Sequence, residues 1–127
     1  MRVIMAILTM LCSLLGCNAQ TEGFRSLSVD DYAKAIADTA VVRLDVRSAE
    51  EFAEGHIEEA LNIDVLKDDF ESKAVAVLPK NKTIAVNCRS GRRSKNAAKI
   101  LVKNGFTVIE LDAGYNDWVA KGMPVTK

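Results

Sequence analysis

TIAVN, residues 83–87, is followed at once by CRSGRRS, residues 88–94. The first five residues form the apolar, β-branched run that is typical of a buried strand in a parallel sheet. The turn residues Ser90 and Gly91 break this strand, and apolar side chains then recur at helical spacing up to Lys103. A strand, a tight turn and an amphipathic helix in this order make up the first two elements of a βαβ unit. The stretch therefore predicts an α/β fold.

The same alternation of strand and helix patterns continues on both sides of this stretch. The predicted strands are residues 40–46, 60–63, 83–87 and 106–111, and the predicted helices are a first one opened by Ser28, a short one from Ser48 to about Gly55, and residues 65–78, 94–103 and 115–121. Short connections between alternating strands and helices favour parallel strand pairs with helices packed on the sheet. We therefore expect an open, mostly parallel sheet with helices on both faces.

The composition indicates one ordinary domain without a strong overall charge. The chain has 127 residues, with 17 Lys and Arg against 17 Asp and Glu. Removing Arg2 with a leader would leave 16 positive against 17 negative side chains. A chain with this balance has no general attraction for nucleic acid, so recognition of an anion must be local. We expect no nucleic-acid partner.

The N-terminal residues resemble an export signal. MRVIMAILTMLCSLL, residues 1–15, has one positive charge and an apolar run that is short for a membrane-spanning helix. The following Gly16-Cys17 completes a likeness to the bacterial lipobox, which predicts a lipoprotein signal peptide over residues 1–16 and lipidation of Cys17. A conventional cleavage site near Ala19 and an uncleaved anchor are the alternatives. We expect a polar tether over residues 17–25, a domain over residues 26–127, and a lipid-anchored protein of the bacterial cell envelope that faces the periplasm or the outside.

The three cysteines have different expected fates. Cys12 would leave with the leader and Cys17 would carry lipid, so Cys88 would be the single free thiol and no internal disulfide could form. A single free thiol is unusual in an oxidising compartment, where it is open to oxidation. An inert, buried cysteine is one interpretation of Cys88. A reactive nucleophile is the other, and the surrounding residues favour it.

Cys88 stands at the carboxyl end of the predicted strand 83–87, which is where open α/β folds place their sites. The tight turn after it points backbone N–H groups inward, and the next helix adds the positive end of its dipole. This arrangement can hold one anion, which can be the thiolate itself. No His and Cys cluster with metal-ligand spacing and no phosphate-binding glycine loop is present in the sequence, so we expect neither a metal site nor a cofactor.

Three ordered motifs resemble the signatures of the rhodanese-domain family. They are LDVRSAEEFAEGHIEEALNI over residues 44–63, the loop CRSGRRS over residues 88–94, and LDAGYNDW over residues 111–118. The last resembles the family's L-x-G-G-x-x-x-W closing motif, with Ala113 in place of the first glycine. The resemblance covers the chain after about Ser26 and implies the rhodanese-like form of the open, mostly parallel sheet.

The resemblance also implies the chemistry of a sulfurtransferase. Cys88 would take the outer sulfur of an anionic donor such as thiosulfate and pass it from a persulfide to a thiol or cyanide-like acceptor. It further implies roles for the rest of the loop: the backbone amides would hold the persulfide, and the three arginines would attract the donor. The loop residues concerned are Arg89, Ser90, Gly91, Arg92, Arg93 and Ser94.

Two other functions stay open at this point. Related phosphatases and arsenate reductases separate the cysteine and the arginine of their loop by five residues, whereas Cys88 and Arg93 are separated by four. The shorter loop favours sulfur over a tetrahedral oxyanion. A non-catalytic module that binds persulfide or redox equivalents would keep the same cysteine, although the arginine-rich loop favours catalysis. Ser94 is expected to cap the helix that follows the loop.

Four further residues need an interpretation. Asp45 and Arg47 end a predicted strand at the same sheet edge as Cys88, where they could bind each other or brace the loop, and bracing is favoured over contact with substrate. His56, the only histidine, invites comparison with cysteine proteases, but the resemblance implies a structural hydrogen bond. Trp118 is predicted to lie in the core.

Overall fold

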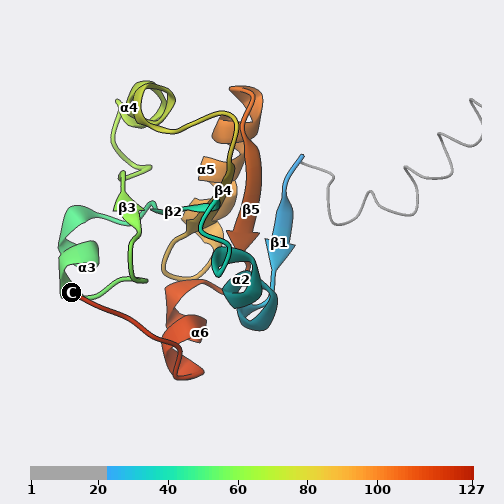
Figure 1. Ribbon diagram of the computed structural model, residues 1–127. Coiled ribbons are helices and arrows are strands. Elements are labelled where there is room, and N and C mark those ends of the chain that lie inside the picture. The colour runs from blue at the N-terminus through green and yellow to red at the C-terminus, as the bar shows by residue number, and fades with distance from the viewer. Residues whose placement is uncertain (1–22) are drawn as a thin grey trace, which may run out of the picture.

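Five parallel strands form one open sheet in the computed structural model, which describes residues 23–127 (Figure 1). The strands are β1 (Arg25–Leu27), β2 (Val42–Asp45), β3 (Leu61–Asn62), β4 (Thr83–Asn87) and β5 (Thr107–Leu111). Their order in the sheet is β1-β5-β4-β2-β3, and every pair is parallel. The predicted sheet is confirmed, with β4 at its centre.

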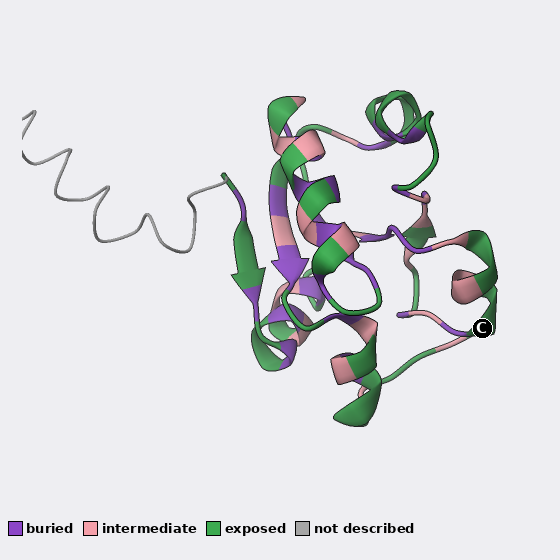
Figure 2. Ribbon diagram, turned by 180° about the vertical axis from the view of Figure 1, so that it is seen from behind, coloured by how far each residue is buried: buried purple, intermediate pink, exposed green. Residues whose placement is uncertain are grey.

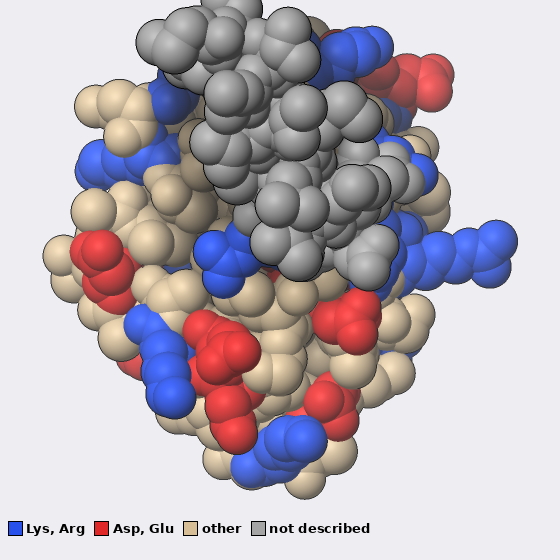
Figure 3. Space-filling model, turned by 90° about the vertical axis from the view of Figure 1, so that its right-hand side faces the viewer, with Lys and Arg blue, Asp and Glu red and all other residues tan. Residues whose placement is uncertain are grey.

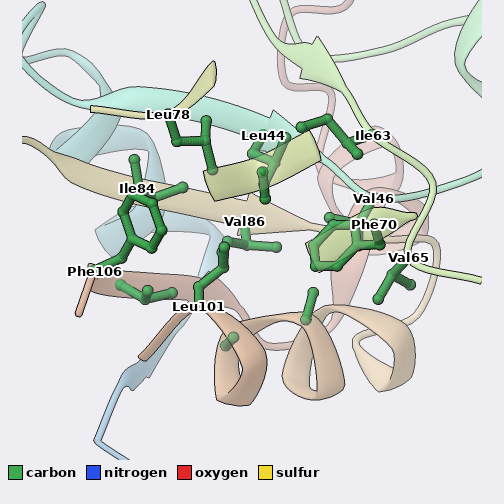
Figure 4. Close-up of a cluster of buried hydrophobic side chains, with 14 of the residues drawn as sticks. Leu44, Val46, Ile63, Val65, Phe70, Leu78, Ile84, Val86, Leu101 and Phe106 are labelled. Atoms are coloured by element: carbon green, nitrogen blue, oxygen red, sulfur yellow. The ribbon is translucent and has the colours of Figure 1, made fainter. Parts of the chain in front are cut away.

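Helices cover both faces of the sheet because successive strand residues point to opposite sides. They are α2 (Val29–Ile36), α3 (Ala49–Glu54), α4 (Phe70–Val77), α5 (Arg92–Lys103) and α6 (Gly114–Ala120). In β4, Ile84 and Val86 pack with buried residues of α4 and α5 (Figure 4). Ala85 faces the other way, into a cluster with residues of α2 and α6. Apart from α3, which has no buried residue, the helices carry buried residues on the side toward the sheet and exposed residues on the outer side (Figure 2).

The N-terminal edge of the domain differs from the prediction. Strand β1 pairs with β5, and Phe24 just before it is buried, so the predicted polar tether over residues 17–25 extends too far. A three-residue strand is too short to show a period of two in the sequence, which explains the missed element. The predicted signal peptide and Cys17 lie outside the described residues.

The helix predicted over residues 65–78 starts later than expected. Helix α4 begins at Phe70, and the residues before it form turns: the N–H of Lys67 donates to the carbonyl of Asp64 at 3.2 Å, and the N–H of Phe70 donates to that of Lys67 at 3.1 Å. The carboxylate of Asp64 then accepts a hydrogen bond from the N–H of Leu66 at 2.9 Å and closes a turn. These local bonds hold residues 64–70 in turns rather than in a helix, so α4 starts later than predicted.

Helix α6 carries the predicted core tryptophan. Trp118 is buried and meets Tyr32 edge to face, with ring centroids 6.1 Å apart. Its indole N–H donates to the carbonyl of Pro124 at 2.9 Å. Val119, the next residue, is about half exposed, because it lies one residue along the helix from the buried face.

The described surface mixes charges of both signs. On the face shown in Figure 3, Lys and Arg side chains are interspersed with Asp and Glu side chains. Among residues 23–127, no helix combines the length and the hydropathy needed to cross a bilayer.

Candidate active site

The loop after β4 lies at the carboxyl edge of the sheet, between α5 and α6. Cys88 follows the last residue of β4 directly, and α5 begins at Arg92. The N–H of Tyr115 donates to the carbonyl of Cys88 at 2.8 Å, and the N–H of Asn116 donates to the carbonyl of Arg89 at 3.0 Å. These two bonds use free N–H groups in the first turn of α6 and fix that helix against the loop.

The sulfur of Cys88 is enclosed by the loop. Cys88 has no exposed surface and borders the apolar cluster beneath α5. Burial alone would fit an inert core cysteine. The polar contacts of Sγ do not: the N–H of Gly91 donates to it at 3.1 Å, and the hydroxyl of Ser94 lies 3.4 Å away. A backbone donor and the start of α5 together favour negative charge at this atom.

Two glycines let the loop and the turn before α6 approach closely. Gly91 has φ +100°, and a Cβ there would overlap the carbonyl oxygen of Asp112. Gly114 has φ +75°, and its Cβ would overlap the carbonyl of Arg89 and lie 2.6 Å from the backbone nitrogen of Ser90. Ala113, which replaces a glycine of the family motif, has φ −95° and is unstrained. Only the second glycine of that motif is sterically required here.

Glu51 of α3 binds two of the three loop arginines. Its carboxylate accepts from Arg93 at 2.8 and 3.0 Å and from the Nε of Arg89 at 2.9 Å. The guanidinium of Arg93, aided by the N–H of Ser48 and by Arg89, holds the pKa of Glu51 well below its usual value. Arg89 and Arg93 are thus engaged in ion pairs, whereas Arg92, the third loop arginine, has no partner among the described residues.

Glu51 was not predicted as a site residue. Ser48 and Glu51 form a capping box at the start of α3, in which the hydroxyl of Ser48 accepts from the N–H of Glu51 at 3.2 Å. The partners of the carboxylate in the loop are 38 and 42 residues away, which no local pattern could reveal. Its place in the motif over residues 44–63 was the available signal.

Ser94 does not cap α5, contrary to the prediction. It is the third residue of the helix and is buried, while Gly91 occupies the N-cap position in a left-handed conformation. The hydroxyl of Ser94 donates to the carboxylate of Glu110, with the oxygens 2.5 Å apart. Glu110, on β5, is also buried and was not predicted as part of the site, because a single Glu in an apolar run carries no local signal.

Asp45 and Arg47 bind each other and also support the site. The guanidinium of Arg47 donates to both carboxylate oxygens of Asp45, at 2.7 Å in the shortest contact, and to the carbonyl of Gly55 at 2.7 Å. It also lies over the ring of Tyr115, 4.2 Å from its centroid. Arg47 thus binds Asp45 and also braces the loop, the two roles that the sequence left open. The bracing runs through Tyr115, whose N–H donates to the carbonyl of Cys88.

A surface hollow lies beside the loop. Its lining includes Arg47, Glu51, Arg89, Tyr115 and Asn116. The hollow therefore brings together the Glu51 ion pairs, the buried guanidinium of Arg47 and the first turn of α6, all next to the Cys88 loop.

His56 has the structural contacts that were expected. Its Nδ1 lies 2.8 Å from the carbonyl of Phe52, and its ring stacks on the ring of Phe52. Its backbone pairs with Thr126 near the C-terminus. These contacts provide no link to Cys88 of the kind a cysteine protease needs. Within residues 23–127, no three side chains of the metal-binding types come together.

The fold and the loop place this chain in a known family. The rhodanese-like domain family matches residues 28–121, and the chain belongs to this family. Relatives include sulfurtransferases, and a sulfurtransferase family is the class that the fold and these relatives support.

Three curated relatives show the range of identity and coverage. Protein HIGH ARSENIC CONTENT 1, mitochondrial, of Arabidopsis thaliana is 38% identical over 75% of this chain, which spans 63% of that protein. Thiosulfate sulfurtransferase PspE of Escherichia coli is 40% identical over 58% of this chain and 70% of its own length. Putative sulfurtransferase YtwF of Bacillus subtilis is 36% identical, over 72% of this chain and 85% of its own.

Solved structures agree with the fold. A rhodanese-related protein from Thermoplasma volcanium matches with a TM-score of 0.72 and 30% identity, over 80% of this chain and 97% of its own. A rhodanese-like domain protein from Staphylococcus aureus matches with a TM-score of 0.67 and 25% identity, over 80% and 98% of the two chains.

Proposed function

We propose that this chain transfers sulfane sulfur from thiosulfate, or a similar anionic donor, to a thiophilic acceptor through a persulfide on Cys88. The observation that carries the proposal is the environment of Sγ: it lies at the carboxyl end of β4, accepts the N–H of Gly91, and stands before the first turn of α5. Membership of the rhodanese-like family supports the same chemistry.

The reaction would consist of two displacements at sulfur. The Cys88 thiolate attacks the outer sulfur of thiosulfate, the new Sγ–S bond forms, and sulfite leaves with the electron pair of the broken S–S bond. An acceptor such as cyanide or a thiolate then attacks the outer sulfur of the persulfide, and Cys88 leaves as a thiolate. The proton of the resting thiol goes to solvent before the first attack, and the cysteine is regenerated after the second.

Arg92 is the arginine that we propose for attracting the donor. It is exposed at the start of α5 and has no partner among the described residues. Arg89 and Arg93 are both engaged by the one carboxylate of Glu51, whose ion pairs hold the loop against α3. A separation between one recruiting arginine and two structural ones follows from these contacts.

The test is the intact mass of the chain after incubation with thiosulfate, beside the Cys88→Ser variant as control. We expect a gain of one sulfur that is absent from the variant and is discharged by cyanide as thiocyanate. A reduced, folded chain that gains no sulfur would reject thiosulfate as the donor. A stable gain of sulfur that cyanide does not discharge would instead support the non-catalytic module that binds persulfide.

Arsenate reduction is a second candidate, because the name of the Arabidopsis relative refers to arsenic. Incubation with arsenate and a thiol reductant, with arsenite as the readout, separates it from sulfur transfer. The four-residue spacing between Cys88 and Arg93 predicts that no arsenite forms.

We also propose that the chain is exported and anchored through lipid on Cys17, which rests on the sequence of residues 1–17. In a bacterial host, labelled palmitate should enter the chain and should not enter the Cys17→Ala variant. Equal labelling of both would refute the anchor.

A further inference from the structure

The buried carboxylate of Glu110 lies beneath the active-site loop, and each of its hydrogen-bond partners there is a donor. One oxygen accepts from the hydroxyl of Ser26 at 2.6 Å, and the other accepts from Ser94 and, at 3.3 Å, from the ammonium group of Lys95. A carboxylate accepts at both oxygens, so this arrangement fits the ionised form. Lys95 also contacts Asp112, which ties this network to the turn before α6.

The contact with Glu110 decides what Ser94 can offer to the sulfur. A serine hydroxyl has one hydrogen, and that of Ser94 is directed to the carboxylate. The carboxylate oxygen is only 2.5 Å from the hydroxyl oxygen, much nearer than Sγ, so the hydrogen stays on the side of Glu110. Toward Sγ of Cys88, 3.4 Å away, Ser94 therefore presents only lone pairs. The protonated thiol can donate to this oxygen, whereas a thiolate would face a second acceptor.

We propose that Glu110, acting through Ser94, is a positioning residue that holds the resting Cys88 as a protonated thiol. The thiolate is the form that oxidants and other electrophiles attack, so the pair would protect the nucleophile until a donor arrives. This inference concerns the regulation of the site and rests on the proposed function for its purpose. The hydrogen-bond direction on which it is based does not depend on the identity of the donor.

The other charged groups around the sulfur act in the opposite direction or are paired. The N–H of Gly91 and the guanidinium of Arg93 favour the thiolate, and Arg93 is itself paired with Glu51. The remaining charges near the loop include the exposed Arg92, Asp64, which acts on Arg93 through space, and three ion pairs. The pairs are Arg47 with Asp45, Arg89 with Glu51, and Lys95 with Asp112. Removal of the hydroxyl of Ser94 leaves all of these groups in place.

Ser94→Ala in the full chain is the first test, with Asn96→Ala, a position two residues further along α5, as the matched control. The readouts are the rate at which iodoacetamide alkylates Cys88 and the ultraviolet absorbance of the thiolate, both at neutral pH without any sulfur donor. We expect both to rise, the rate by about fivefold, as the loss of one hydrogen bond to the thiol gives. An unchanged or lower rate would overturn the proposal, because a serine that donates to the thiolate predicts a fall.

Glu110→Gln tests the first half of the pathway. It weakens the acceptor for Ser94, so alkylation should rise in the single variant and should rise no further when it is combined with Ser94→Ala. The same rise on both backgrounds would show that the charge of Glu110 acts directly and would overturn the route through Ser94. No rise on either background would overturn the role of Glu110. Because sulfur transfer is not measured, failure of the proposed function would leave these readouts unaffected, and their failure would leave the transfer test standing.

Discussion

Gly114→Ala is the substitution whose effect the structure predicts most sharply, because the chain contains a matched control. Gly114 and Gly122 both have left-handed backbones, with φ +75° and +72°. A Cβ at Gly122 has nothing within 4 Å, whereas one at Gly114 would overlap the backbone of Arg89 and Ser90, next to the nucleophile. The two alanine variants therefore share the conformational cost and differ only in the clash.

The magnitudes follow from that difference. The left-handed conformation costs alanine about 1–2 kcal/mol in either variant. The clash at Gly114 adds about 1–3 kcal/mol, as overpacking elsewhere does, since backbone atoms cannot turn aside as a side chain can. Relief of the overlap requires the loop to move, and a displacement of about 1 Å at a reacting group costs about 100-fold in rate.

Thermal unfolding by circular dichroism and thiocyanate formation from thiosulfate and cyanide measure the two effects. We expect Gly122→Ala to lower Tm by roughly 4–16 °C and to keep its activity, and Gly114→Ala to melt lower still and to lose about 100-fold in kcat/KM. Equal melting temperatures and equal activities for the two variants would refute the close contact between α6 and the loop.

Three further predictions concern charged residues. Arg92→Ala should raise KM for thiosulfate several-fold with little change in kcat. Added salt should raise the KM of the wild type toward that of the variant, because it screens the attraction, and a fall in kcat alone would contradict a recruiting role. The pKa of Glu51 lies below its ordinary value of 4.5, so its ion pairs stabilise the fold fully above that pH and less as the pH falls through the folded pKa; the stability lost in Glu51→Gln should shrink below pH 4.5, as denaturant melts at several pH values would show. Arg47→Met should destabilise the domain by about 3–5 kcal/mol, because it leaves the buried carboxylate of Asp45 without its partner, and unfolding in urea at neutral pH would measure this.

The predicted strands were the most reliable part of the sequence interpretation. The run over residues 83–87 matches β4 residue for residue, because a strand buried on both faces needs an unbroken apolar sequence. Helix starts were less reliable: α4 begins five residues after the predicted Val65, and α5 begins at Arg92 rather than at Ser94. Local turns hold residues 64–70 before α4, and the Ser94 hydroxyl that was expected to cap α5 donates instead to Glu110.

The site likewise has properties that the local sequence predicts and properties that it does not. The position of Cys88 after an apolar strand and before a glycine turn is a local property, and the sequence by itself determined it. That Glu51 forms ion pairs with both Arg89 and Arg93 was decided only by the tertiary structure.

The sequence alone therefore determined the class of fold, the nucleophile and its loop, since strand and helix periods and turn residues act over a few neighbours. The tertiary structure alone decided which arginine is free, where the hydroxyl of Ser94 points, and which glycine must lack a side chain. Those properties depend on atoms that the folding of the sheet brings within 4 Å from positions up to 42 residues apart, as with Arg93 and Glu51, and pairing at that separation leaves no periodic trace in the sequence.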